Sequence, residues 1–327
     1  MIVLNIECDG KVYNPLGGAS YVFEKDIVHF LLDKFDKNNI VISVGAQPNS
    51  SPHFGTLIVF STAFSLAKRM KEVNSNLNVK VLFEVVDTAP SETIEINGIK
   101  YQKSLKSTGR INNNFSDYLE ILDYFKLNDG IDYFIRYQSE FNNQKYIYPI
   151  VKNIIENKDI VSKILDPKYK NLRIRVACPH CGLADKESKM TKFINDKIIS
   201  YCPEHGEYVT DIKKECYKLE YNTPVRNLIR AIAYSMHNSD NEQNYQIMRI
   251  TGSDYAGFYQ EELLYKPAAL LNFPINQLPT ILYKPLILDW SSAKLSKSLY
   301  VNKGAYSDLP PYLINYEYLK EEKELMH

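Results

Sequence analysis

The chain has 327 residues, of which 45% are apolar and 24% charged, and its 39 basic side chains balance its 39 acidic ones. This length and composition are typical of a folded globular protein with a large core. A dedicated nucleic-acid binder usually carries a basic excess. The balanced charge therefore argues against a large RNA interface, although a local basic patch stays compatible with it.

The N-terminus and the cysteines indicate a compartment. No segment approaches the roughly 20 consecutive apolar residues that span a bilayer, and Glu7 and Asp9 interrupt the first segment too early for a signal peptide. Three of the five cysteines are clustered, which is more typical of a metal site in a reducing compartment than of a disulfide framework. We therefore expect a cytoplasmic protein.

The first third of the chain predicts a βαβ unit. Residues 23–37 space their apolar side chains at helical intervals, which predicts an amphipathic helix. A short β-branched run at 41–46 predicts a buried strand, a turn-rich loop leads into a helix over 55–71, and 79–87 predict a second buried strand. Such a unit implies a parallel sheet with ligands at the carboxyl ends of its strands.

The remaining elements continue this pattern. In chain order, the sequence predicts a polar insertion at 88–115, helices at 116–127 and 140–165, and a cysteine-containing excursion at 173–214. It then predicts a strand at 245–252, a helix at 258–271 and a strand at 278–288. We find no internal repeat or low-complexity tract. We therefore expect an α/β fold with one Rossmann-like parallel sheet and helices on both faces. It should form a single domain over 1–300 that is split by insertions at 88–115 and 173–214, with a short tail at 301–327.

A candidate phosphate site lies at the turn from strand to helix in the βαβ unit. The turn reads His53-Phe54-Gly55-Thr56. Backbone N–H groups and the helix dipole stabilise phosphates at such a turn, and a glycine there lets a flat base approach the backbone. The plainer alternative is an ordinary helix start with a structural histidine.

A second candidate follows the last predicted strand. Residues 294–298 read Lys-Leu-Ser-Lys-Ser. A loop with two lysines suits the clamping of a polyphosphate whose charge shifts during a reaction. An exposed basic loop is the alternative.

Together, and in this order, the two motifs resemble signatures of class I aminoacyl-tRNA synthetases. Residues 52–56 resemble the HIGH motif, residues 294–298 resemble KMSKS, and residues 252–254, Gly-Ser-Asp, resemble the family's Gly-x-Asp. Within this class the chain resembles the archaeal-type class I lysyl-tRNA synthetase, over residues 40–300. That enzyme also has a polar residue at the end of HIGH and zinc-binding cysteines between the signatures. This chain departs from the family pattern at Ser50, where glycine is common, and at Thr56, which replaces the final His or Asn.

The resemblance implies a Rossmann-like core of the HUP type that uses ATP and Mg²⁺ to activate an amino acid for protein biosynthesis. The likeness to the lysyl enzyme implies lysine as that amino acid. It assigns His53 and Lys297 to the transition-state phosphates, Lys294 to loop closure, Gly55 to adenine and Asp254 to the ribose. The further ATP contacts that it implies are Thr56, Gly252, Ser296 and Ser298. Asp87, at the end of the second strand, could meet the α-amino group of the amino acid; a plain strand-end turn is the alternative.

The cysteine cluster predicts a structural zinc site. Cys178 and Cys181 form one Cys-x2-Cys pair, and Cys202 and His205 form a Cys-x2-His pair. Three thiolates and an imidazole make a closed tetrahedral set for Zn²⁺. His180 is a rival ligand, but its position between two cysteines makes it the poorer choice. The other cysteines, which we expect to be ordinary packed residues, are Cys8 and Cys216.

The acceptor of the activated amino acid is left open by the sequence. Residues 299–327 can supply one helix at most, so we expect no anticodon-binding domain. The chain could charge the acceptor end of a tRNA, join the amino acid to a small molecule, or be an idle paralogue that binds RNA or regulates. A related nucleotidyltransferase is a further alternative. The basic residues of the first insertion that could contact RNA are Lys100, Lys103, Lys106 and Arg110.

Overall fold

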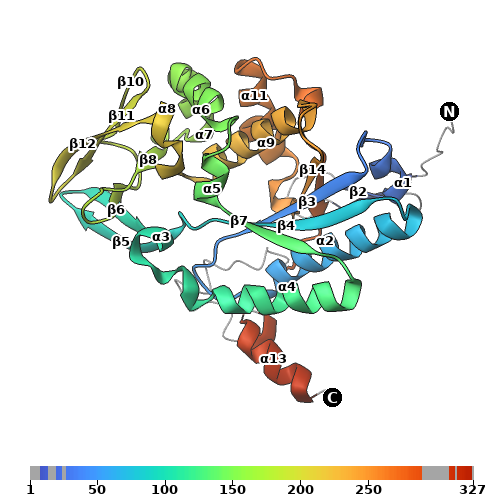
Figure 1. Cartoon of the computed structure of the whole chain (residues 1–327). Helices are drawn as coiled ribbons and strands as arrows, with labels where there is room; N and C mark the ends of the chain where they lie inside the picture. Colours follow the sequence, from blue (N-terminus) through green and yellow to red (C-terminus); the bar gives the residue numbers. More distant parts are fainter. Residues whose placement is uncertain (1–7, 14–19, 24–26, 289–308, 314, 326–327) are drawn as a thin grey trace.

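A five-stranded parallel sheet organises the fold, in a computed structural model that describes residues 8–13, 20–23, 27–288, 309–313 and 315–325 (Figure 1). In spatial order the sheet contains β15 (Ile281–Lys284), β14 (Gln246–Gly252), β3 (Asn39–Ala46), β4 (Asn78–Val85) and β7 (Tyr133–Tyr137). Every neighbouring pair is parallel. The predicted α/β fold with a Rossmann-like sheet is confirmed.

The central strands are apolar because both of their faces are covered. Along β3, Ile40, Ile42 and Val44 pack on one face, while Val41 points to the other, as the period of two requires. On that second face two polar residues, Ser43 and Glu84, are also buried. The sheet therefore has one largely apolar face and one face with a polar patch near its carboxyl end.

Helices form the two outer layers (Figure 1). Helices α2 (Phe54–Val73) and α4 (Phe115–Asp129) pack together on the apolar face. Helix α9 (Thr223–Ser239) packs against β14 on the opposite side, with α6 (Ile147–Glu156) against it. The aromatic rings of Phe60 and Phe83 meet edge to face between α2 and the sheet, with centroids 5.2 Å apart.

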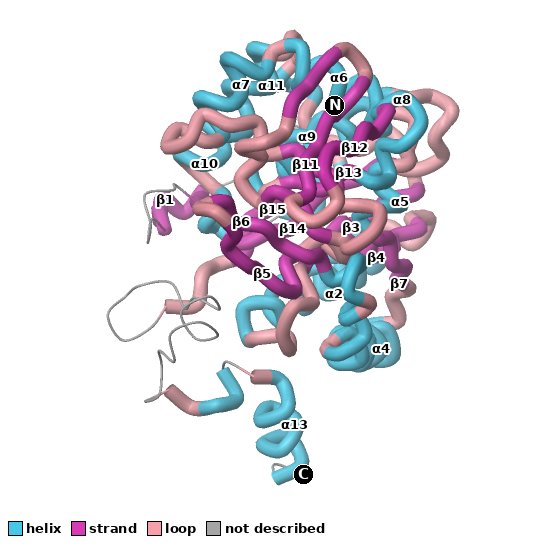
Figure 2. The backbone as a smooth tube through the Cα atoms, turned by 90° about the vertical axis from the view of Figure 1, so that its left-hand side faces the viewer, coloured by secondary structure: helices cyan, strands magenta, loops and turns pink. Residues whose placement is uncertain are grey.

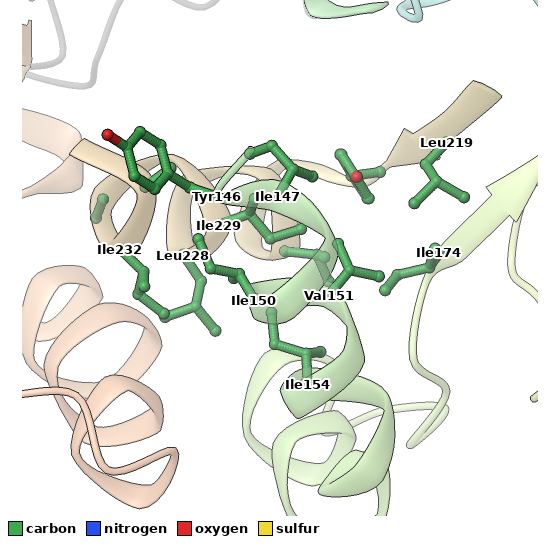
Figure 3. Packing of buried hydrophobic residues seen from close by; sticks show 14 of the residues in the cluster. Tyr146, Ile147, Ile150, Val151, Ile154, Ile174, Leu219, Leu228, Ile229 and Ile232 are labelled. Carbon is green, nitrogen blue, oxygen red and sulfur yellow. The ribbon is translucent and has the colours of Figure 1, made fainter. Parts of the chain in front are cut away.

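Helix α9 is fixed by its start and by one apolar stripe. The side chain of Asn222 accepts a hydrogen bond from the backbone N–H of Val225, and a proline lies in the first turn, both favourable at a helix N-terminus. Figure 3 shows Leu228, Ile229 and Ile232 of this helix facing Ile150 and Ile154 of α6. This packing sets the rotation of α9 and therefore which of its residues point toward the sheet.

The two segments predicted as insertions form one small unit. Strand β6 of the first segment pairs with β9 of the cysteine-containing segment, and a separate antiparallel sheet has the order β10-β11-β12. Strand β8 pairs with β13, which leads into α9. The strands of this unit are β5 (Pro90–Ile96), β6 (Ile99–Ser104), β8 (Ile174–Val176), β9 (Leu183–Asp185), β10 (Lys192–Ile194), β11 (Lys197–Cys202), β12 (Gly206–Asp211) and β13 (Leu219–Tyr221).

The other described elements are short. They are β1 (Cys8–Tyr13), β2 (Ser20–Phe23), α1 (Ile27–Leu32), α3 (Leu105–Thr108), η1 (Arg110–Asn113), α5 (Gln138–Asn142), α7 (Lys158–Leu165), α8 (Ile212–Glu215), η2 (Cys216–Lys218), η3 (Ser253–Tyr255), α10 (Phe258–Gln260), the π-helical η4 (Glu261–Tyr265), α11 (Lys266–Leu270), η5 (Ile275–Gln277), η6 (Pro311–Leu313) and α13 (Tyr316–Leu325). In Figure 2 α13 lies below α4, and the ammonium group of Lys320 is 4.0 Å from a carboxylate oxygen of Asp117.

Three predicted elements differ from the structure. The helix predicted over 23–37 is wrong at both ends: Phe23 belongs to β2, and the backbone N–H groups of Asp36 and Lys37 donate to the side chain of Gln246 instead of continuing α1. The helix predicted over 140–165 is broken into α5, α6 and α7. The strand predicted over 278–288 is limited to β15, after which Pro285 lacks the N–H for further pairing.

Of the helices in the described ranges, none combines the length and the apolar character that a membrane-spanning segment requires.

Candidate functional site

Two cavities lie at the carboxyl end of the sheet, beside the boundary between β3 and β14. The chain continues from β3 to β4 on one side, while β14 and β15 lie on the other, so this boundary is a topological switch point. Ligands of open α/β sheets bind at such points. The first space, which we call the sheet-edge cavity, is lined by residues of β3, α2, β14 and β15, namely Gly45, His53, Gly55, Thr56, Val59, Phe60, Ile250, Thr251, Gly252, Asp254, Tyr255, Lys284, Leu286 and Ile287.

The structure therefore brings two sequence motifs to one cavity. His53 precedes α2 with extended backbone, and its imidazole lies over Gly55. A Cβ built on Gly55 would be 2.7 Å from Cε1 and 2.9 Å from Nδ1 of His53. Any side chain at Gly55 would therefore displace the histidine, so the glycine is required by the close approach of these two residues.

The second motif has the same construction. After β14, the carboxylate of Asp254 folds back over Gly252, and a Cβ built there would be 2.3 Å from Oδ1 of Asp254. Gly252 has φ of −70° and ψ of 148°, a conformation open to any residue. Space for the carboxylate, and not backbone conformation, is thus what requires glycine at this position.

Sequence reasoning missed a cation in the same cavity. Lys284, at the end of β15, is buried, and its Nζ would be 3.7 Å from a Cβ at Gly55. A lysine inside the apolar run of residues 278–288 was the available signal. The predicted basic loop that contains Lys294, Ser296, Lys297 and Ser298 lies outside the residues that the structure describes.

Asp87 does not line either cavity. It is buried after β4, where its Oδ2 accepts a hydrogen bond of 3.2 Å from the hydroxyl of Ser139. Its Oδ1 has no hydrogen-bond partner among the described residues. Burial raises the pKa of this carboxyl group, and the positive charge of Lys106 opposes the rise. The predicted contact of Asp87 with an α-amino group stays a prediction.

The second space, the arginine cavity, has a volume of about 400 Å³. It shares Gly45, His53, Thr56, Thr251 and Tyr255 with the sheet-edge cavity, so the two are adjacent. Its other lining residues are Ala46, Gln47, Asn49, Ser50, Val86, Tyr118, Arg226, Asn227, Arg230 and Arg249. Sequence reasoning missed the three arginines, although charged residues inside an apolar strand and on a helix with an apolar stripe were a signal.

A buried ionic network lies under α9. Arg136 of β7 forms an ion pair with Glu84 of β4, and the hydroxyl of Tyr234 donates to the same carboxylate. Ser43 and Tyr234 share a further hydrogen bond of 2.7 Å. Burial opposes ionisation of Glu84, but the Arg136 and Arg230 guanidinium groups hold the pKa of this carboxyl below its ordinary value. The network anchors α9 to the sheet beside the arginine cavity.

The four predicted zinc ligands lie together, away from these cavities. The ligand atoms of Cys178, Cys181, Cys202 and His205 are all within 4.8 Å of one another. The sulfurs of Cys181 and Cys202 are 3.5 Å apart, and Nδ1 of His205 lies 3.5 Å from the sulfur of Cys202. A tetrahedral Zn²⁺ with bonds of about 2.3 Å to sulfur separates its ligands by roughly 3.8 Å. The donor set and its spacing therefore fit zinc.

His180 and Cys216 behave as predicted. The ring of His180 stacks on that of His205 at 5.0 Å between centroids, and His180 does not belong to the ligand cluster. Cys216 is buried, and its thiol donates to the carbonyl of Ile212. Burial, followed by the neighbouring thiols, raises the pKa of Cys181 to about 12. A divalent cation bound here would favour the thiolate form that metal coordination requires.

No protein-family profile matches the chain, and no curated protein matches it. Among solved structures it is similar to tryptophanyl-tRNA synthetase from Plasmodium falciparum, with 18% identity, a TM-score of 0.40, and coverage of 86% of this chain and 62% of that one. It is also similar to a putative arginyl-tRNA synthetase from Campylobacter jejuni, with 11% identity, a TM-score of 0.31, and coverage of 80% of this chain and 58% of that one. For glutamate-tRNA synthetase from Elizabethkingia anophelis the identity is 11%, the TM-score 0.35, and the coverage 81% of this chain and 54% of that one. The chain thus spans less than two thirds of each of these structures. At this level of similarity the likeness says nothing about substrate or partner.

Proposed function

We propose that this chain uses ATP to activate an amino acid as its aminoacyl-adenylate. The observation that supports the proposal most is the convergence of residues 53–56 and 252–254 on one cavity at the switch point of the sheet. These motifs lie far apart in the chain, and each includes a glycine whose Cα is covered by the side chain of its own motif. A nucleotide at this position would meet the N-terminus of α2, which favours phosphate.

In the proposed reaction, a carboxylate oxygen of the amino acid attacks the α-phosphorus of ATP. A new oxygen–phosphorus bond forms, the bond to the bridging oxygen of the β-phosphate breaks, and pyrophosphate leaves with the electron pair. Positioning and charge stabilisation provide most of the catalysis in such transfers. We assign His53 to the phosphates, Gly55 to adenine and Asp254 to the ribose, with Mg²⁺ accompanying ATP. Thr56 and Gly252 complete the proposed ATP contacts.

The predicted loop extends these roles. Lys297 is proposed to stabilise the transition-state phosphates, Lys294 to assist closure, and Ser296 and Ser298 to contact ATP. Asp87 is proposed to meet the α-amino group. We also propose that residues 1–300 form one catalytic domain and that the Zn²⁺ held by the cysteine cluster has a structural role, since four protein ligands leave no open position for chemistry.

The test is ATP–pyrophosphate exchange with each amino acid in turn. Exchange that depends on one amino acid, and that is lost in His53→Ala, would support the proposal. Absence of exchange with every amino acid, with and without bulk tRNA, would contradict it and favour an idle paralogue that acts as a binding module.

The acceptor is proposed to be either the acceptor end of a tRNA or a small molecule. Of the basic residues in the first insertion that could contact RNA, Arg110 forms an ion pair of 2.8 Å with Glu92. Aminoacyl transfer should be measured with full-length tRNAs, acceptor minihelices and no RNA. Transfer to minihelices would favour tRNA, and adenylate formation that never yields aminoacyl-RNA would favour the small molecule.

A further inference from the structure

The arginine cavity carries more positive charge than the described protein balances. Arg226 and Arg230 lie four residues apart on α9 and therefore on one side of the helix, opposite the stripe that packs on α6. Arg249 projects from β14, two residues after Ile247, which packs in the core on the α9 side of the sheet. All three side chains thus reach the same cavity from two rigid elements.

Neutral partners hold these guanidinium groups in place. Arg226 donates to the hydroxyl of Thr223 at 3.2 Å, and Arg230 donates to the side-chain carbonyl of Gln138 at 3.2 Å. Arg249 donates to the side-chain carbonyl of Asn227 at 3.0 Å. The buried Nε atoms of Arg226 and Arg230 have no hydrogen-bond partner within the described ranges.

Acidic partners are scarce. Among the described residues, these three arginines form one ion pair, in which a guanidinium nitrogen of Arg230 lies 3.9 Å from a carboxylate oxygen of Glu84. Glu84 is already paired more closely with Arg136 and accepts from Tyr234. Arg136 and Arg230 therefore share one carboxylate, and no Asp or Glu is present among the described residues that line the cavity.

Buried charge without a counter-charge is costly, because the protein interior solvates an ion less well than water does. Burial, followed by the neighbouring Arg230, lowers the pKa of Arg226 to about 10. Burial likewise lowers the pKa of Arg249, and Arg230 adds to the effect. The protein thus maintains a destabilised group of like charges that an anionic ligand would relieve.

We propose that the arginine cavity binds the side-chain carboxylate of an acidic amino acid, and that this amino acid is the one activated. The inference rests on the proposed function. The wall shared by the two cavities contains His53 and Thr56, so the α-carboxylate can lie toward the nucleotide while the side chain points to the arginines. A guanidinium group matches a carboxylate in geometry as well as charge. A lysine side chain would instead bring an ammonium group among three like charges.

The absence of a side chain at Gly45 lets Arg230 lie close to the backbone of β3. A Cβ built on Gly45, at the end of β3, would be 3.3 Å from Nη1 of Arg230. The guanidinium group therefore packs directly against the backbone of the strand, in space that a larger residue at position 45 would fill. Arg230 should accordingly receive the ligand in the position that it already occupies.

The direct test is isothermal titration calorimetry of the full chain. L-glutamate, L-aspartate, their amides and L-lysine are titrated separately in the presence of a non-hydrolysable ATP analogue. One of the two acids should bind at least about tenfold more tightly than its own amide, which has the same shape without the charge. Equal or tighter binding of the amide, or preference for lysine, would overturn the inference without any mutation.

The variant Arg249→Gln adds a second measurement. It should lower the affinity for the preferred acid by about tenfold or more and the affinity for the amide by less, because the acid loses a charged contact and the amide only a neutral hydrogen bond. The matched control is Arg69→Gln, an exposed arginine of α2 that is paired with Glu72. If Arg249→Gln weakened the ATP analogue and not the acid, the arginines would serve a phosphate and the inference would be wrong.

Pyrophosphate exchange separates this inference from the proposed function. Preferential binding of an acid without exchange for any amino acid would support the cavity assignment and contradict adenylate formation. Exchange supported by lysine or by a neutral amino acid, with no preference for an acid, would support adenylate formation and overturn the cavity assignment.

Discussion

The substitution Gly252→Ala tests the construction of the sheet-edge cavity at one methyl group. The added Cβ would lie 2.3 Å from Oδ1 of Asp254, and real contacts of this kind are essentially never under 3.0 Å. Because the backbone of Gly252 suits alanine, the carboxylate and not the main chain has to move. A displacement of about 1 Å in a positioning group can lower a rate by about 100-fold.

We therefore expect Gly252→Ala to lower kcat/KM for ATP in pyrophosphate exchange by about 100-fold. Its melting temperature should stay near that of the wild type, since the substitution also removes backbone freedom from the unfolded chain. The control is Ser253→Ala in the same turn, which does not line the cavity. Exchange by Gly252→Ala at the rate of the wild type would refute the role of Asp254, and a large fall in melting temperature would refute the claim that only the carboxylate moves.

Three further predictions follow from separate contacts. Lys284→Met should weaken ATP binding about tenfold, since a buried cation is lost. The control Lys266→Met, which changes an exposed lysine, should not weaken it, and equal ATP affinities of the two variants in calorimetry would count against the prediction. Elemental analysis should find about one Zn²⁺ per chain and markedly less in Cys202→Ser; less than half an equivalent in the wild type would sink the metal assignment. Burial lowers the pKa of His237 from 6.5 to about 4, because the buried ring resists protonation, so the folded state should lose stability as pH falls from 6.5 through 4. Denaturant titrations should show a smaller acid loss in His237→Leu, and an identical pH dependence would contradict this.

The parts of the fold that local pattern determines were predictable. The apolar runs of β3, β4 and β14 and the helical period of α2 predict a parallel sheet, because strands covered on both faces have no polar face to show. The zinc ligands were predictable for a similar reason, since the short spacing of each pair already places two donors at one turn.

Long-range contacts account for what the sequence could not predict. The side chain of Gln246 accepts hydrogen bonds from the backbone of Asp36 and Lys37, some 210 residues away along the chain, so these two residues do not belong to the helix expected at 23–37. The pairing of β6 with β9 joins two segments that the sequence presents as separate insertions. The residue pattern within either segment does not predict that its strand pairs with the other segment.

The arginine cavity was missed because its residues belong to different patterns. Arg249 lies within an apolar strand, and Arg226 and Arg230 lie on a helix whose apolar stripe faces elsewhere. Each looks like an ordinary surface charge until the register of β14 and the rotation of α9 turn all three inward. The rotation is set by the packing on α6, which involves residues about 75 positions earlier, such as Ile150 and Ile154.

The metal unit and the arginine cavity are connected through the start of α9. Strand β8 lies just before Cys178 and pairs with β13. Strand β13 leads through Asn222 directly into the first turn of α9, the helix that carries Arg226. The pair is closed by a buried contact between Arg175 and Glu220 at 3.3 Å. The segment that carries the cysteines is therefore joined by one strand pair to the strand from which α9 begins. A metal ion bound by the cysteines would in this way help to position Arg226 and Arg230, the two like charges that α9 brings to the arginine cavity.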